Sequence, residues 1–369
     1  MRLRVCDFER RCVTISPDQS APTYACCSAA CAVSPTLTDK TAFLSSLLFG
    51  VAARSDAAST GCTMKAIKQI LPAPTKHWVG NGFHVAPVFH SKAFTAELSP
   101  WLMFDYAEPK AFGPTRTRRG VGRHPHRGFE TVTIAFQGEV EHGDSVGNRG
   151  VIGPGDVQWM TAGRGIVHEE YHSGEFSAKG GAFEMAQLWV NLPRKSKMAP
   201  PSYQPILDRD IPVAPLRAAA DFASDGDEAQ TCELDQARVR VIAGALNGVT
   251  GPAHVHTPIE LWDVHLDAVG KPFELDIPEG HNAIIFARAG TASVGAPGDE
   301  REIVPQGVAI LRREGTTVRL VAREPGTKLL VLGGEPIDEP IAARGPFVMN
   351  TEAELRTANE DYRAGRLGQ

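Results

Sequence analysis

Short β-rich runs separated by glycine and proline turns recur along most of the chain. The first clear examples are "FETVTIAFQGEVEHGD" at residues 129–144, which reads as two strands around a Gly turn, and "RGVIGPGDVQWMTAGRGIVHEEYH" at residues 149–172. Regular short strands with turn signals are typical of β-sandwiches and barrels. The 36 Gly and 27 Pro in 369 residues suit such a turn-rich fold. The sequence therefore predicts an all-β protein.

The second half of the chain repeats this plan. The segment "NAIIFARAGTASVGAPGDEREIVPQGVAILRREGTTVRLVA" has the same order of strands and turns, so that Gly138 aligns with Gly290 and Gly163 with Gly315. We therefore expect two similar β domains, at residues 64–195 and 231–369. The stretch 196–230, which begins with the Pro-rich and polar "KSKMAPPSYQPILDRDIPVAP", is interpreted as their linker.

The two ends of the chain differ from these β domains. Near the C-terminus, Thr351 followed by Glu354 forms a capping-box pattern and predicts a short helix. At the other end, residues 1–63 hold six of the seven cysteines. We interpret residues 1–63 as a disordered extension, or as sequence upstream of a native start at Met64. A main body with Cys232 alone does not depend on disulfides, which favours a reducing, cytoplasmic location.

Charge and hydropathy argue against two classes of partner. The net charge of -5 indicates no general attraction to nucleic acid or to anionic membranes. The chain has no run of about 20 apolar residues, so no transmembrane helix is expected.

Two pairs of polar residues share one spacing. His124 and His126 stand at i and i+2 at the start of a strand, and His168 and Glu170 repeat this spacing in "VHEEY". Residues at i and i+2 of a strand point to the same face. A single pair of this kind is more often a hydrogen-bonded core or a solvated face. Because there are two pairs, we expect three imidazoles and one carboxylate to converge on a divalent transition metal.

Several longer motifs carry a resemblance to a known family. The segments "HPHRGFETVT", "GNRGVIGPGDVQWMTAGRGIVHEE", "LWVNLP" and "GPFVMNT" resemble the pirin family of bicupins, and the match extends over roughly residues 83–369. The resemblance implies two cupin-type (jelly-roll) barrels in one monomer. It also implies one iron, as Fe2+, in the N-terminal barrel, with His124, His126, His168 and Glu170 as ligands.

Other residues near these motifs have open interpretations. Glu130 lies four residues after His126 and is a candidate to orient a histidine or to act as a base, with a structural carboxylate as the alternative. Arg127 suits either an anionic group or a salt bridge that holds the loop. Core packing is the default interpretation for three apolar residues that could also support the cavity, namely Phe129, Trp159 and Met160. His142 and His172 lie close to the motif in sequence, and His172 is interpreted as a peripheral histidine.

The second half contains a histidine pair with similar spacing. "HVHTPIE" places His254, His256 and Glu260 as His124, His126 and Glu130 are placed. The aligned glycines argue against a second site, however. They match the first-half histidines to other residue types, namely Asp276, Pro278 and Leu320. We therefore expect the C-terminal barrel to lack metal ligands.

These observations leave three functional hypotheses. The first is a dioxygenase that cleaves quercetin or a related flavonol or phenol with O2, with Glu170 or Glu130 taking the proton of a substrate hydroxyl. The second is an iron-dependent redox-sensing binding protein or co-regulator that docks a protein partner without turnover. The third is a scaffold that the metal only stabilises.

Overall fold

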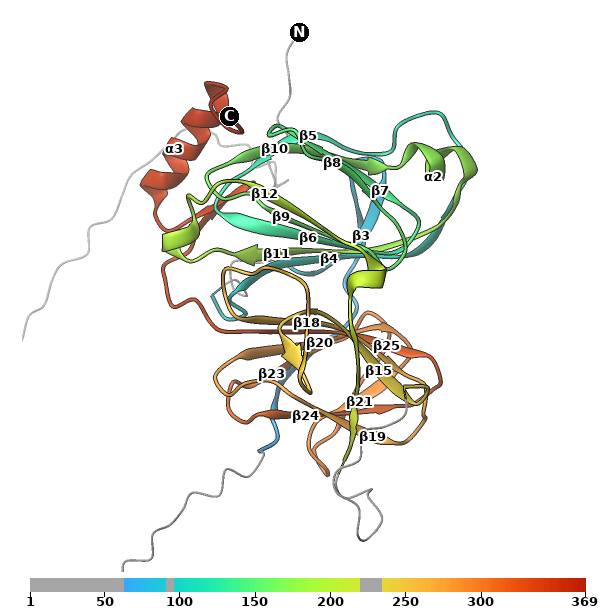
Figure 1. The fold of residues 1–369 in the computed structure, drawn as a ribbon. Helices are drawn as coiled ribbons and strands as arrows, with labels where there is room; N and C mark the ends of the chain where they lie inside the picture. The colour runs from blue at the N-terminus through green and yellow to red at the C-terminus, as the bar shows by residue number, and fades with distance from the viewer. Residues whose placement is uncertain (1–62, 91–95, 220–233) are drawn as a thin grey trace, which may run out of the picture. The chain divides into compact units, whose positions relative to one another are not determined.

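The fold is built almost entirely from β-strands. The structure, a computed structural model, describes residues 63–90, 96–219 and 234–369, and these lie in one compact unit, Cys62–Gln369. The extension expected at residues 1–63 falls outside the described residues apart from Thr63. The predicted all-β class is confirmed (Figure 1). The described helices are α2 (Gly174–Lys179), α3 (Glu352–Arg363) and the 3-10 turns η1 (Arg194–Ser196) and η2 (Asp208–Asp210).

The first barrel consists of a seven-stranded and a four-stranded sheet. The larger sheet has the order β12-β9-β6-β11-β4-β3-β2, and the smaller one has the order β5-β10-β7-β8. The strands of the larger sheet are β2 (His77–Val79), β3 (Phe83–Phe89), β4 (Trp101–Phe112), β6 (Phe129–Gln137), β9 (Val157–Thr161), β11 (Gly181–Asn191) and β12 (Ser202–Ile206). Those of the smaller sheet are β5 (Gly120–His126), β7 (Val140–Asp144), β8 (Arg149–Ile152) and β10 (Ile166–His172).

The second barrel repeats this arrangement. Its sheets have the orders β1-β23-β20-β25-β18-β15-β13 and β14-β19-β24-β21-β22. The strands of the first are β1 (Ile67–Leu71), β13 (Val213–Pro215), β15 (Ala237–Ala243), β18 (Ile259–Leu266), β20 (Asn282–Ala289), β23 (Val308–Leu311) and β25 (Thr327–Gly334). Those of the second are β14 (Arg217–Ala218), β19 (Pro272–Asp276), β21 (Ala292–Val294), β22 (Arg301–Ile303) and β24 (Thr317–Ala322).

Strand pairing does not follow the domain boundaries expected from the sequence. The early strand β1 pairs with β23 of the second barrel, although the N-terminal domain was expected to span 64–195. Within the expected linker, 196–230, β12 pairs with β9 of the first barrel and β13 pairs with β15 of the second. The second barrel is therefore completed by a strand from the start of the described chain, and the expected linker contributes a strand to each barrel.

The two larger sheets pack against each other and form a common core. Phe104 and Tyr106 of β4 contact Phe286 of β20, with ring centroids 4.8 and 4.9 Å apart. Beside them Arg288 lies within 2.8 Å of Glu184 and 3.4 Å of Asp263, and all three side chains are buried. Burial alone would raise the pKa of Asp263, but the His265 hydrogen bond and the nearby arginines hold that pKa below its usual range.

The C-terminal segment returns to the first barrel. A hairpin of β26 (Ala342–Arg344) and β27 (Phe347–Met349) leads into α3, which starts with the capping box predicted at Thr351. A further short hairpin joins β16 (Ala245–Leu246) and β17 (Val249–Thr250). Across the described residues, no helix is long and apolar enough to cross a membrane.

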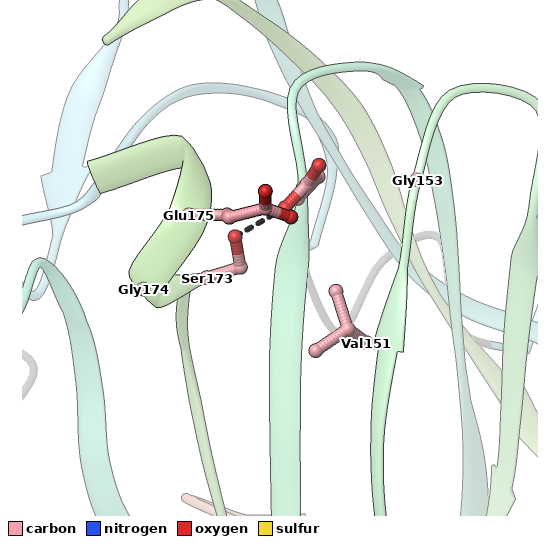
Figure 2. A pocket seen from close by; sticks show the side chains of 6 residues that line it. Val151, Gly153, Ser173, Gly174 and Glu175 are labelled. Atoms are coloured by element: carbon pink, nitrogen blue, oxygen red, sulfur yellow. Dashed lines mark hydrogen bonds between the residues drawn. The ribbon is translucent and has the colours of Figure 1, made fainter. Parts of the chain in front are cut away.

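Two surface depressions lie away from the histidine motifs. One, of about 280 Å³, is lined by residues near α2, where Ser173 donates a hydrogen bond to Glu139 (Figure 2). The other, of about 170 Å³, includes Lys68 and Asn282. Neither lining contains a histidine.

Candidate metal centre

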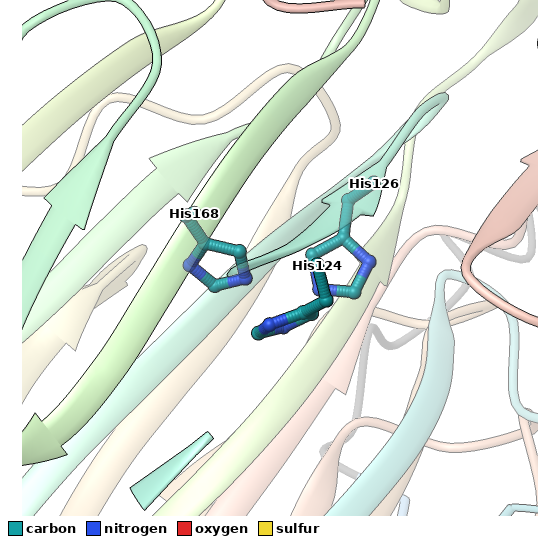
Figure 3. Close-up of side chains that lie close together, drawn as sticks. All are labelled: His124, His126 and His168. Carbon is teal, nitrogen blue, oxygen red and sulfur yellow. The ribbon is translucent and has the colours of Figure 1, made fainter. Parts of the chain in front are cut away.

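Strands β5 and β10 bring His168 beside His124 and His126. They are antiparallel neighbours, and His168 lies directly opposite His124. The ring of His124 has its centroid 4.2 Å from that of His168 and 4.8 Å from that of His126, and the last two are 4.9 Å apart. Figure 3 shows the three rings turned toward one another. One nitrogen of each ring lies within 4.8 Å of the others, a spacing that could hold a metal ion.

The hydrogen bonds of these rings fit a metal. His124 Nδ1 lies 2.9 Å from the carbonyl of Gly122, and His126 Nδ1 lies 3.4 Å from that of Pro346. Metal-bound histidines commonly donate one ring N–H to such a carbonyl, which leaves the other nitrogen for the ion. Both nitrogens of His168 are buried without a hydrogen-bond partner among the described residues. A buried polar atom without a partner is costly, and an ion would satisfy it.

Burial also keeps two of these rings neutral. It lowers the pKa of His126 and of His168 well below the ordinary value, and the neighbouring histidines act in the same direction. A neutral imidazole is the form that binds a metal. The pocket therefore needs no proton release from these two side chains at neutral pH.

Among the described residues, Glu170 falls outside the three-histidine set. It forms a second possible ligand set with His142 and His168, which shares His168 with the three-histidine set. This follows from the sheet order, since β10 runs between β5 and β7. Thr133 Oγ1 and Gln158 Nε2 both donate to Glu170 Oε1, at 3.3 Å each. These bonds hold the carboxylate in place and leave Oε2 available.

His142, which the sequence placed only near the motif, belongs to the site surroundings. It pairs across β7 and β10 with Glu170, and its Nε2 lies 3.2 Å from Asp144 Oδ2. Its ring stacks on Tyr203, with centroids 4.8 Å apart. The sequence signal was present, because His142 and Asp144 also have i, i+2 spacing on a strand next to the His168 strand.

Glu130 does not join the cluster. Its cross-strand partners are Thr161 and Val190, while its neighbour Thr131 pairs with Trp189, which contacts His126. Because faces alternate along a strand, Glu130 points to the opposite side of β6, toward the core between the barrels. Its carboxyl accepts a hydrogen bond from Thr161 Oγ1 at 2.7 Å. The structure thus gives Glu130 neither a histidine to orient nor a place in the pocket.

A Glu130→Gln variant tests this placement through pH. Burial raises the pKa of Glu130 to about 7. A carboxyl whose pKa is raised by folding contributes stability below its unfolded-state pKa and loses it as pH rises toward 7. Wild type should therefore lose more stability than the variant between pH 5 and pH 8, measured by urea unfolding of metal-free protein. Parallel pH profiles, or a metal content lowered in the variant, would contradict the placement.

The C-terminal segment packs against the turn that follows the HPH motif. Arg127 pairs with Asp361 of α3 at 2.8 Å, so the salt-bridge interpretation describes its contacts. Gly128 has a φ of 87°, and a Cβ there would lie 2.0 Å from the carbonyl of Val348. Lys197 Nζ is buried and donates to the carbonyls of Gly128 and Val348. The turn after the HPH motif is thereby fixed against the C-terminal strand.

The remaining residues singled out in the sequence pack against other side chains. Phe129 packs on His126 and on Trp189, with centroids 5.0 and 4.3 Å apart, whereas Trp159 faces the core between the barrels. Met160 lies in a small buried cluster. His172 stacks on Phe183, and burial lowers its pKa to about 4.

The second barrel places its histidine motif differently. His254 and His256 are exposed, and Glu260 bonds to His281 at 3.0 Å. At the positions that match the first-barrel ligands, the second barrel has residues that are engaged in other contacts. Asp276 pairs with Arg217, and Leu320 is part of an apolar core. Among the described residues, the possible ligand sets lie in the first barrel.

Comparisons with known proteins agree with this architecture. Two family profiles match, Pirin over residues 82–190 and the Pirin C-terminal cupin domain over residues 261–368. A Pseudomonas aeruginosa protein named "Putative quercetin 2,3-dioxygenase" is 48% identical over 305 residues, which cover 82% of this chain and 99% of that protein. Pirin of Rattus norvegicus is 37% identical over 273 residues, which cover 73% of this chain and 83% of that protein.

Solved structures give the same result. The crystal structure of a quercetin 2,3-dioxygenase from Acinetobacter baumannii is 46% identical, with a TM-score of 0.74 over 83% of this chain and 99% of that one. The resemblance seen in the motifs is thereby confirmed over both barrels. The chain belongs to the pirin family.

Proposed function

We propose that this chain is a metal-dependent dioxygenase that cleaves quercetin or a related flavonol with O2. The proposed cofactor is a single Fe2+ held by His124, His126, His168 and Glu170. The observation that supports it most is the buried His168 ring, whose two nitrogens have no hydrogen-bond partner among the described residues. The names of the relatives from Pseudomonas aeruginosa and Acinetobacter baumannii supply the substrate class.

The histidines and Glu170 would have different roles in this reaction. The three imidazoles offer nitrogen donors, which suit iron but also other divalent metals. When bound, Fe2+ would bring the substrate hydroxyl and O2 together and lower the pKa of that hydroxyl. Glu170 is held at Oε1 by Thr133 and Gln158, so Oε2 is the atom that would contact the ion or take the hydroxyl proton.

Oxygen uptake with quercetin tests this proposal. Fe2+-loaded wild type should consume O2 and bleach quercetin, and a His126→Ala variant should be slower by at least about 100-fold, because losing a ligand should exceed the 10- to 100-fold effect of losing an outer partner. His254→Ala, at an exposed histidine of the second barrel, is the matched control and should match wild type. Equal rates for wild type and His126→Ala would end the proposal. A metal-loaded wild type inert toward flavonols and catechols would favour the redox-sensing alternative.

A further inference from the structure

A row of polar side chains crosses the larger sheet of the first barrel. In the register of β4, β11, β6 and β9, Asp105 lies opposite Gln187, Gln187 opposite Thr133, and Thr133 opposite Gln158. Residues directly opposite in an antiparallel pair share one face of the sheet. All four side chains therefore point to the same side.

That side is the interior of the first barrel. Two members of the row, Thr133 and Gln158, donate hydrogen bonds to Glu170. The neighbours of Asp105 on β4, Phe104 and Tyr106, point the other way and pack against the second barrel. Asp105 thus stands at the end of a polar row that begins beside the candidate metal ligands.

Asp105 differs from the rest of the row in having no partner. Gln187 Oε1 accepts a hydrogen bond from Thr133 at 2.7 Å, and Gln158 contacts Tyr203 as well as Glu170. No group among the described residues bonds to the Asp105 carboxyl. Burial raises its pKa to about 7. A carboxyl in such a place is destabilising unless something else satisfies it.

Solvent reaches the interior face of the sheet at this end. Thr131, Thr133, Gln158 and Met160 of β6 and β9 are buried, whereas Asp105, Gln187 and two apolar neighbours on β4 and β11, Met103 and Trp189, are half-buried. Met103 and Trp189 lie opposite each other, one step along from the polar row. Trp189 also contacts His126, with ring centroids 5.2 Å apart. Met103 and Trp189 thus lie between the solvent-reached end and the histidines.

We propose that Asp105 accepts a hydrogen bond from a second hydroxyl of the substrate, remote from the hydroxyl held at the histidine cluster. This inference rests on the proposed function and narrows its substrate class. Asp105 and Thr133 are two strands apart, or roughly 10 Å at the usual strand spacing. A ligand that reaches both ends carries hydroxyls on separate rings, and its rings would pack on Met103 and Trp189.

Two flavonols test the assignment. Quercetin has hydroxyls on several rings, whereas 3-hydroxyflavone retains a single one. Their affinities for Zn2+-loaded protein, measured by titration, give a readout that does not depend on turnover. Wild type should bind quercetin more tightly than 3-hydroxyflavone. Asp105→Leu should weaken quercetin binding by about 10- to 100-fold, the usual effect of losing a hydrogen bond to a charged group, and leave 3-hydroxyflavone unchanged. Asp105→Asn, which keeps an uncharged acceptor, should fall between.

Controls separate this role from a structural one. Glu108→Gln changes a carboxyl on the same strand, which contacts Gln306 of the second barrel, and should leave both affinities unaltered. Because Asp105 has no protein partner, Asp105→Leu should not lower the melting temperature. Equal affinity of wild type for the two flavonols, or an equal loss of both in Asp105→Leu, would overturn the proposal. If the selective loss appears but wild type consumes no O2 with quercetin, the binding role stands and the dioxygenase proposal fails.

Discussion

Replacing His168 by Ala should abolish metal binding. Its ring is fully buried, lies between the other two imidazoles and His142, and has no hydrogen-bond partner among the described residues, so the ion is its expected partner. Loss of an outer partner of a ligand typically lowers metal affinity 10- to 100-fold, and loss of a ligand should exceed about 100-fold. Competition with a chelator, followed by elemental analysis of the protein, measures the change.

His172 provides the matched control for this variant. It lies on the same strand and the same face as His168, but its Nε2 bonds to the carbonyl of Gly82 at 3.0 Å and its ring stacks on Phe183. His172→Ala should lower stability and keep the metal. If both variants lost metal equally, the loss would reflect damage to the strand. If His168→Ala kept full affinity, His168 would not be a ligand.

Replacing Arg288 by Ala should destabilise the fold by about 3–5 kcal/mol, the usual loss when one partner of a buried ion pair is removed. Arg288 has a side chain 5% exposed, forms ion pairs with Glu184 and Asp263, and stacks on Phe136. Arg240 would still compensate Asp263, but Glu184 would stay buried beside Tyr106 without its cation. Urea unfolding at neutral pH, on metal-free protein, measures the free energy.

An exposed ion pair on the same barrel provides a control for the loss of stability in Arg288→Ala. Arg301 and Asp299 lie 3.5 Å apart with side chains 64% and 59% exposed. Exposed pairs contribute about 0–1 kcal/mol, so Arg301→Ala should change stability little. Similar losses in the two variants would mean that the buried network between the barrels adds no specific stabilisation.

Local patterns predicted the all-β class and the repeat of two similar β domains, and the family resemblance added the cupin-type barrels. The aligned glycines Gly138 and Gly290 do follow equivalent strands, β6 and β20, and Thr351 does cap a C-terminal helix. Strand and turn periodicity encodes these features within a few residues. The pairing of β1 with β23 was not predicted, because residues far apart in the chain form that pair and local periodicity carries no information on register.

The site was predictable only where one strand carried the signal. His124 with His126, and His168 with Glu170, each share a strand, and i, i+2 spacing fixes their common face. Glu130 was assigned from its spacing to His126. However, β5 ends at His126 and β6 begins at Phe129, so a turn separates the two residues and their spacing does not fix which face of the sheet Glu130 occupies. Asp105 lies on β4, and only the register with β11 and β6 relates it to the site.

Anomalous diffraction from crystals of the metal-loaded protein would test the central claim most directly. One strong peak is expected, bonded at about 2.0–2.2 Å to ring nitrogens of His124, His126 and His168 and to a Glu170 oxygen. A peak held by His142 and Glu170 without His124 and His126, or crystals of loaded protein with no peak in the first barrel, would contradict it.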